Sequence, residues 1–305
     1  MIRHRFTLDV TEVAQFGEPA HLAAELLLPE DRVPELLFVC IPGGGMNRHY
    51  FDLPTPEGEA EVSFARVMCE RGHAVALLDP LGAGESTCPA DAYLLHPDRT
   101  SAAAGATVNH ILEGLRAGSF DPRCPAAPGI RSVGVAHSLG ALMTVVQQAQ
   151  FHQHQGLALL GYHTAGVPAY LTDADRAIDK TYARDNLIAL ARQRFPAGPW
   201  HEMPPSTSTR RVSAANAIER VMVTPSLMAM LPDMVSPDAA AVDVPVLIGL
   251  GDADLHGDPY RTPQSYSGSP EVTLIVIPET RHNHFVYPSR TYLYDRIARW
   301  AENLP

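Results

Sequence analysis

The most informative segment of this sequence is Gly134-Val135-Ala136-His137-Ser138-Leu139-Gly140, where an apolar run at residues 130–136 gives way to a helical pattern at residues 139–150. The spacing small–x–Ser–x–Gly is typical of a sharp turn from strand into helix, which leaves the serine Oγ exposed at the top of a sheet. Small residues are needed because strand and helix cross closely there, and Ala136 stands where glycine is more common. Ser138 is therefore a candidate nucleophile, although the same pattern can also open an ordinary helix.

Apolar runs and helical patterns alternate along the rest of the chain. This alternation predicts a mostly parallel central sheet with helices on both faces, because parallel strands need crossover connections. Residues 5–13 and 21–28 are expected to form a hairpin ahead of it. Further strands are expected at residues 36–41, 73–78, 130–136, 156–160, 244–250 and 272–277, and helices at residues 59–71, 100–116, 139–150 and 289–300.

One region interrupts the alternation. Residues 166–242 contain no clear buried strand, and helical patterns are expected at residues 173–195 and 213–222, with a flexible loop at 204–209. We predict a core domain made of residues 1–165 and 243–305, with 166–242 inserted as a helical cap. Four methionines in this region either fill the insertion's own core or form an adaptable apolar wall over an active site. They are Met222, Met228, Met230 and Met234.

Acidic and imidazole side chains follow the last two predicted strands. Asp252 and Asp254 come directly after residues 244–250, and His282 and His284 come shortly after residues 272–277. Parallel strands deliver their functional groups at their carboxyl ends. A serine nucleophile needs a base within hydrogen-bond reach and an acid that orients the base. The chain supplies serine, acid and histidine in that order.

Taken together, these motifs resemble the α/β-hydrolase superfamily, whose arrangement is a nucleophile elbow, a late acid, a last-loop histidine and a glycine-rich turn after an early strand. Here the glycine-rich turn is Pro42-Gly43-Gly44-Gly45. The resemblance covers residues 36–300, and the insertion before the acid strand matches the family's cap. It implies an α/β-hydrolase fold with an inserted helical cap, and Ser138 as the nucleophile.

The resemblance also assigns the acid. The family pattern places the carboxylate three residues after the glycine that ends the strand, which is Asp254. Asp252 remains the competing candidate, with loop capping as its other interpretation. Asp258, in Gly257-Asp258-Pro259, is expected to be a turn residue.

For the base, the family's last loop places histidine after a small residue and before an apolar one. His284, followed by Phe285, fits this pattern, with Asn283 in place of the usual glycine. Asn tolerates a left-handed backbone better than most residues. The resemblance therefore implies His284 as the base, and His282 is the alternative.

The resemblance further implies two backbone donors for an oxyanion. One is the N–H of Leu139, the residue after the nucleophile at the start of a helix. The other comes from the glycine-rich turn, where Gly44 is the candidate and Gly45 the second choice. Pro42 replaces the family's usual histidine and so removes that histidine's hydrogen bonds.

Charge and composition narrow the range of partners. The formal net charge of −11 argues against nucleic acid or an anionic membrane surface. No apolar stretch approaches the roughly 18 residues of a membrane span, and the amino terminus has no apolar signal region. We expect a cytoplasmic protein acting on a small molecule. The helix around Trp300 is either packed on the core or a candidate homodimer contact.

Cofactor motifs are incomplete. The glycine triplet is not followed by the Lys-Ser/Thr of a phosphate-binding loop, and the Gly82-Ala83-Gly84 turn lacks the third glycine of a dinucleotide site. We expect Asp79 to anchor that turn instead. His282-x-His284 has no further ligands at a recognised metal spacing, and the four cysteines show no C-x-x-C spacing. No cofactor or metal is therefore predicted.

The resemblance implies an acyl-enzyme mechanism with Ser138, His284 and Asp254 as the triad. We expect a carboxylic ester or lactone with substantial apolar surface as the substrate, because of the methionine-rich insertion. The same triad supports thioester hydrolysis, acyl transfer and carbon–carbon bond hydrolysis. A non-catalytic ligand-binding protein on the same scaffold is the alternative from another class, since a fold does not fix a function.

Overall fold

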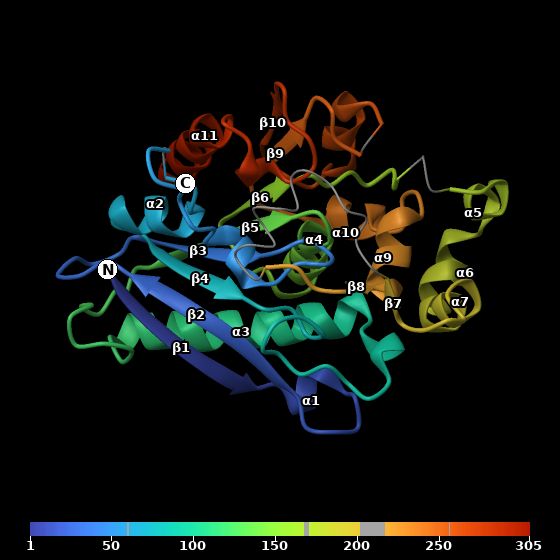
Figure 1. The fold of residues 1–305 in the computed structure, drawn as a ribbon, viewed down its shortest axis with the longest axis horizontal. Coiled ribbons are helices and arrows are strands. Elements are labelled where there is room, and N and C mark those ends of the chain that lie inside the picture. The colour runs from blue at the N-terminus through green and yellow to red at the C-terminus, as the bar shows by residue number, and fades with distance from the viewer. Residues whose placement is uncertain (60, 168–170, 202–216, 256) are drawn as a thin grey trace.

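A twisted eight-stranded sheet forms the centre of the computed structural model, which describes residues 1–59, 61–167, 171–201, 217–255 and 257–305. The strand order is β1-β2-β4-β3-β5-β6-β9-β10 (Figure 1). β1 pairs antiparallel with β2 and β2 with β4, and the remaining pairs are parallel, which confirms the predicted mostly parallel sheet. The strands are β1 (Ile2–Asp9), β2 (His21–Leu28), β3 (Leu36–Ile41), β4 (Ala74–Leu78), β5 (Arg131–His137), β6 (Gly156–Leu160), β9 (Val246–Gly251) and β10 (Val272–Ile277).

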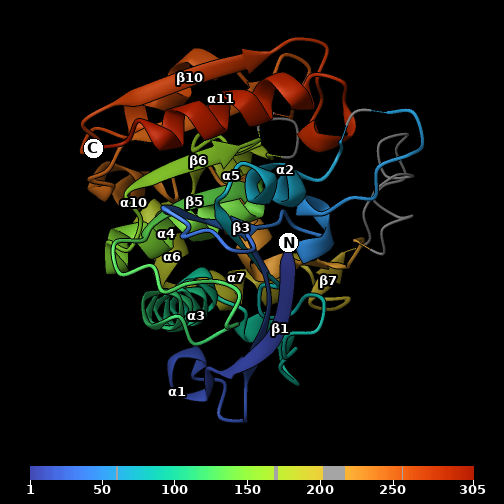
Figure 2. The same ribbon diagram turned by 90° about the vertical axis from the view of Figure 1, so that its left-hand side faces the viewer.

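Helices cover both faces of this sheet, as the alternation of the sequence predicted (Figures 1 and 2). The six residues of β3 are all buried and alternate between two hydrophobic clusters, one on each face. Leu37, Val39 and Ile41 pack with residues of α3 (Pro97–Ala117) and α4 (Leu139–Phe151). Leu36, Phe38 and Cys40 pack with residues of α2 (Phe64–Glu70) and α11 (Arg290–Glu302). Period-two burial on both faces explains why the strand is apolar throughout.

Two predicted elements near the amino terminus differ from the structure. The strand expected at residues 5–13 is β1, which ends at Asp9, and the chain then forms the short helix α1 (Thr11–Ala14). The carboxylate of Asp9 accepts a hydrogen bond from the Thr11 N–H at 2.9 Å, which favours that turn. The helix expected at residues 59–71 begins only at Phe64, because the Ser63 hydroxyl caps it by accepting from the Arg66 N–H at 3.0 Å.

The insertion between β6 and β9 contributes no strand to the central sheet among its described residues. The helix expected at residues 173–195 is three short helices, interrupted where Ile178 is extended and Asp179 caps a new turn. The helix expected at residues 213–222 is wrong in its described part, because Val221–Met222 forms the strand β8. Residues 213–216 and the loop expected at 204–209 lie outside the described residues. The insertion contains α5 (Asp173–Ala177), α6 (Lys180–Asp185), α7 (Leu187–Arg194), β7 (Trp200–His201), β8, α9 (Val223–Met230) and α10 (Ser236–Ala241).

Residues 217–221, which we call the cap anchor, lie across the glycine-rich turn that follows β3. The Asn47 N–H donates to the Ala217 carbonyl at 3.0 Å, and the Glu219 N–H donates to the Gly45 carbonyl at 2.7 Å. The Asn47 side chain also donates to Glu219 Oε1 at 2.9 Å. The carboxyl-terminal part of the insertion is thus hydrogen-bonded to the glycine-rich turn. The boundaries predicted for the cap domain stay a prediction.

Short helical turns occupy the loops at the carboxyl edge of the sheet. They are η1 (Arg48–Phe51), η2 (Ala92–Leu94), η4 (Pro259–Ser265) and η5 (His284–Val286). Within the described ranges, no helix has both the length and the apolar character that crossing a bilayer requires.

Candidate active site

Ser138 sits in the sharp turn between β5 and α4, as its motif predicted. Its backbone has φ 52° and ψ −118°, a conformation that a residue with a side chain adopts only when its surroundings enforce it. The Ser138 N–H donates to the Leu160 carbonyl at 2.7 Å, which holds the turn against β6. A Cβ atom at Gly140 would overlap the carbonyl oxygens of Ile41 and Pro42, so close packing of α4 on the end of β3 requires glycine there.

Three loops at the carboxyl edge bring a hydroxyl, an imidazole and a carboxylate into line. The Ser138 Oγ lies 2.8 Å from Nε2 of His282. Nδ1 of the same ring lies 2.6 Å from Oδ1 of Asp254. With its proton on Nδ1, His282 donates to the carboxylate and accepts from the serine hydroxyl, which is the geometry that activates a serine.

His284, the histidine expected at this position, does not contact Ser138. Its Nε2 lies 2.9 Å from Oδ2 of Asp254, and its side chain is completely buried. The neighbouring Phe285 explains the difference, because its ring stacks on Tyr50 and Phe64 with centroids 5.2 and 5.7 Å apart. This packing draws the His284 backbone inward and leaves the less buried His282 beside the serine. The apolar residue after His284 is thus a core anchor, and it does not mark the histidine that reaches Ser138.

Asp254 is held as a carboxylate in a buried place. Its side chain is 1 % exposed, and this burial by itself raises its pKa. The hydrogen bonds and positive partial charges of His282 and His284 outweigh burial and hold the pKa well below its ordinary value. The Leu255 N–H adds a third donor, 2.7 Å from Oδ1. The acid is therefore ionised throughout the physiological pH range.

The two competing aspartates have structural roles. Asp252 accepts hydrogen bonds from the backbone N–H groups of Glu279 and Thr280 at 2.9 and 3.1 Å, so it caps the loop that carries the histidines. Asp258 caps η4 by accepting from the Tyr260 N–H at 3.0 Å. Both therefore support loops and leave Asp254 as the carboxylate in contact with an imidazole.

His137, the residue before Ser138, supports the loop that carries His282. Its Nε2–H donates to the His282 carbonyl at 2.7 Å. Burial, followed by the charges of His282 and His284, lowers the pKa of His137 well below the ordinary histidine value. The ring is therefore neutral and acts as a hydrogen-bond donor. Sequence reasoning gave this residue no role.

The glycine-rich turn packs against the nucleophile turn. A Cβ at Gly43 would lie 2.7 Å from Nδ1 of His137 and 3.1 Å from Cβ of Ser138, and one at Gly44 would lie 3.5 Å from Cβ of Leu139. Leu139 begins α4, and the first N–H groups of a helix have no partner within it. Gly44 and Leu139, the expected oxyanion donors, are thus neighbours beside the serine. Gly45 has φ 76° and its carbonyl is bonded to the cap anchor.

A buried arginine that sequence reasoning missed ties the glycine-rich turn to β4. Arg48 is 2 % exposed and forms ion pairs with Asp79 and, at 2.6 Å, with Glu85. Asp79 also accepts the backbone N–H groups of Arg48 and Glu85 at 2.8 and 2.9 Å. The expected anchoring role of Asp79 therefore extends to the glycine-rich turn beside Ser138. The position of Arg48, three residues after the last glycine of the turn, was the available signal.

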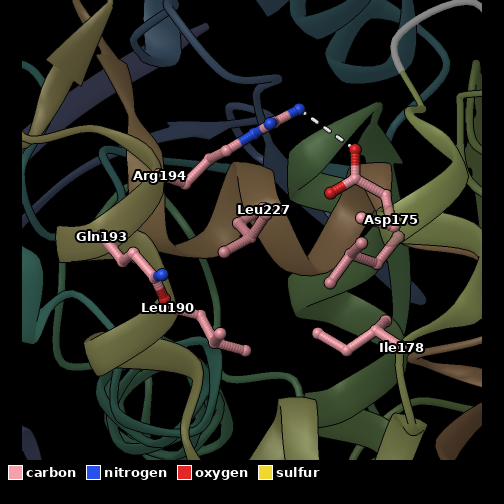
Figure 3. Close-up of a pocket in the computed structure, with 8 residues that line it drawn as sticks. Asp175, Ile178, Leu190, Gln193, Arg194 and Leu227 are labelled. Carbon is pink, nitrogen blue, oxygen red and sulfur yellow. Dashed lines mark hydrogen bonds and ion pairs between the residues drawn. The ribbon is translucent and has the colours of Figure 1, made fainter.

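A separate pocket of about 340 Å³ lies within the insertion (Figure 3). Its walls are mainly apolar, and an ion pair between Arg194 and Asp175, 3.0 Å apart, closes one side of it. Leu227 and Leu231 line it, and they follow β8, whose Val221 packs against Gly44. The complete lining is Ala174, Asp175, Ile178, Leu190, Gln193, Arg194, Leu227 and Leu231.

The described part of the chain contains no cluster of three or more histidine, cysteine, aspartate or glutamate side chains arranged to hold a metal ion. The His282–Asp254–His284 group is held together by hydrogen bonds between its members.

The chain matches the model of the alpha/beta hydrolase family over residues 38–292, and it belongs to that family. Solved structures of similar fold include the alpha/beta hydrolase GrgF from Penicillium sp. sh18, at 12 % identity and a TM-score of 0.63 over 100 % of this chain and 99 % of that one. A thermophilic esterase from Thermogutta terrifontis is 15 % identical, with a TM-score of 0.61 over 98 % of each chain. Proline iminopeptidase from Mycobacterium smegmatis is 16 % identical, with a TM-score of 0.60 over 98 % and 97 %.

At such identities these structures show a shared fold. None of the curated proteins compared with the chain matches it. The family assignment supports a hydrolase.

Proposed function

We propose that this protein is a serine hydrolase that cleaves a carboxylic ester or lactone of a largely apolar small molecule. The observation that carries the proposal is the unbroken set of contacts from Ser138 through His282 to Asp254. His282 replaces His284 as the proposed base, because it is the imidazole within hydrogen-bond distance of the serine hydroxyl.

The proposed reaction has two halves. His282 Nε2 takes the hydroxyl proton as Ser138 Oγ bonds to the substrate carbonyl carbon, and Asp254 stabilises the imidazolium that forms. The carbon–oxygen bond then breaks and His282 returns the proton to the leaving alkoxide. Water, deprotonated by the same ring, attacks the acyl-enzyme and releases the acid with free Ser138.

We assign the backbone N–H groups of Gly44 and Leu139 to the developing oxyanion, because donors fixed in advance stabilise that charge at little reorganisation cost. The apolar side of the substrate is proposed to meet the start of the cap. A Cβ at Gly44 would lie 3.4 Å from Val221, and a Cβ at Gly82 would lie 3.1 Å from the sulfur of Met222. These side chains place apolar surface against the glycine-rich turn, which packs beside Ser138, and against the turn after β4.

The test is intact-mass spectrometry after incubation with a fluorophosphonate, combined with hydrolysis of nitrophenyl esters and lactones of graded size. Wild type should gain one adduct, and Ser138→Ala should gain none while losing at least about 10³-fold in kcat. His282→Ala should also lose labelling, because the hydroxyl is then left without its base.

Ser132→Ala is a matched control, because Ser132 Oγ also lies near an imidazole, 3.1 Å from Nδ1 of His154, but away from the site. This variant should keep the adduct and the turnover. A folded wild-type protein that gains no adduct, or a Ser138→Ala variant that keeps full turnover, would refute the proposed function.

A further inference from the structure

We propose that His284 is a positioning residue for Asp254: it holds one oxygen of the carboxylate so that the other faces His282. This inference rests on the proposed function, and it adds a second histidine that does not react. His284 donates from Nε2 to Oδ2 at 2.9 Å, whereas His282 and the Leu255 N–H donate to Oδ1 at 2.6 and 2.7 Å.

The division of the two oxygens fixes the orientation of the carboxylate. Both imidazole contacts are satisfied together only when Oδ1 faces His282 and Oδ2 faces His284. If His284 did not donate to it, Oδ2 of Asp254 would lose this hydrogen bond while the side chain stays buried, at 1 % exposure. Such a group turns toward another donor or takes up a proton, and either change weakens the hold on His282.

The surroundings of His284 suit a fixed donor. The side chain is fully buried, and the following Phe285 is stacked between Tyr50 and Phe64. The ring centroid of His137 lies 5.7 Å from that of His284, and His137 is neutral, so it places no positive charge beside His284. His282 has a different environment, with 24 % of its side chain exposed and its Nε2 turned to the serine. The buried histidine thus orients the acid, and the more exposed one exchanges the proton.

Glutamine and methionine at position 284 form a matched pair, because they are similar in size and flexibility and only glutamine can donate a hydrogen bond. We expect His284→Met to lower kcat by about 10- to 100-fold, which is the effect of losing one hydrogen bond to a charged group, with KM within about threefold of wild type. His284→Gln should recover most of the loss. Turnover is expressed per fluorophosphonate-titrated site, so misfolded protein does not contribute.

A measurement on the unmodified protein accompanies the variants, since a buried substitution can also impair folding. Nitrogen-15 NMR of the histidine rings should find the proton of His284 on Nε2 and that of neutral His282 on Nδ1.

Three results would overturn the inference. These are unchanged kcat in His284→Met, equal loss in the Gln and Met variants, or an unprotonated Nε2 on His284. A dead His284→Gln beside an active His282→Ala would instead make His284 the base. If wild type gains no adduct at Ser138, the proposed function itself fails, whereas normal labelling with an unaffected His284→Met refutes only the positioning role.

Discussion

Replacing His154 should flatten the dependence of stability on pH. His154 is 1 % exposed and contacts Ser132 Oγ at 3.1 Å and the Gln147 amide at 3.3 Å. Burial lowers its pKa from the ordinary 6.5 to about 4. Between these values the unfolded chain binds a proton that the folded protein excludes. The contribution of His154 to the free energy of unfolding is therefore fully present above pH 6.5 and is lost progressively as the pH falls toward 4.

The size of this effect follows from the two pKa values. A shift of one pKa unit corresponds to about 1.4 kcal/mol, so His154 contributes about 2 kcal/mol less to the free energy of unfolding at pH 5 than at pH 7.5. His154→Gln keeps a hydrogen-bonding side chain that does not titrate. Its free energy of unfolding should therefore change with pH by about 2 kcal/mol less than that of wild type over this interval.

Urea unfolding at pH 7.5 and pH 5, followed by far-UV circular dichroism, measures this difference. His110→Gln is the control substitution, because this histidine lies on the exposed side of α3. Parallel pH profiles for wild type and His154→Gln would show that His154 does not titrate as its burial indicates. Such a result would refute the reasoning from burial to proton exclusion.

Two further substitutions test the architecture of the site. Asp254→Asn should keep the fold but lower kcat by on the order of 10³- to 10⁴-fold, because an amide no longer selects the Nδ1–H tautomer of His282; near-normal turnover in the folded variant would exclude Asp254 as the orienting acid. Gly140→Ala should lower the free energy of unfolding by more than about 2 kcal/mol, because its Cβ would overlap the backbone carbonyls of Ile41 and Pro42. Gly129→Ala, which meets open space, is its control in the same thermal melts, and equal melting temperatures would contradict the packing argument.

Much of the fold could be predicted from local sequence, because the central strands are buried on both faces and are continuously apolar. The expected bounds of β3 and β6 agree with the structure for this reason. The expected bounds of β2 and of the edge strand β10 agree as well. The turn at Ser138 was also predictable, since its small residues form a recognisable local pattern, even though the contact that requires Gly140 is with the distant carbonyls of Ile41 and Pro42. Position after β9 narrowed the acid to Asp252 and Asp254, and the family resemblance selected Asp254, which the structure brings together with Ser138 through an imidazole.

The choice between two histidines could not be made locally. It depends on Phe285 packing with Tyr50 and Phe64, which are distant in sequence and fix the path of the last loop. The cap anchor was missed for the same reason, because Glu219 is 172 residues along the chain from Asn47, to which it is hydrogen-bonded. A residue pattern can predict which side chains reach one edge of a sheet, but not which of two neighbours faces inward.

The cap anchor gives the cap and the glycine-rich turn a common backbone scaffold. Gly45 and Asn47 each share a hydrogen bond with the anchor, one residue and three residues after Gly44. We therefore expect a compound that displaces α9 to strain the turn that carries the Gly44 N–H and so to weaken binding there. Thermodynamic linkage then requires a ligand at that turn to change the affinity of the first compound by the same factor. Binding of a mimic of the tetrahedral intermediate should consequently change the affinity of a ligand of the insertion, and the reverse should hold. A substitution that contacts only one of the two ligands should then alter the affinity of the other as well.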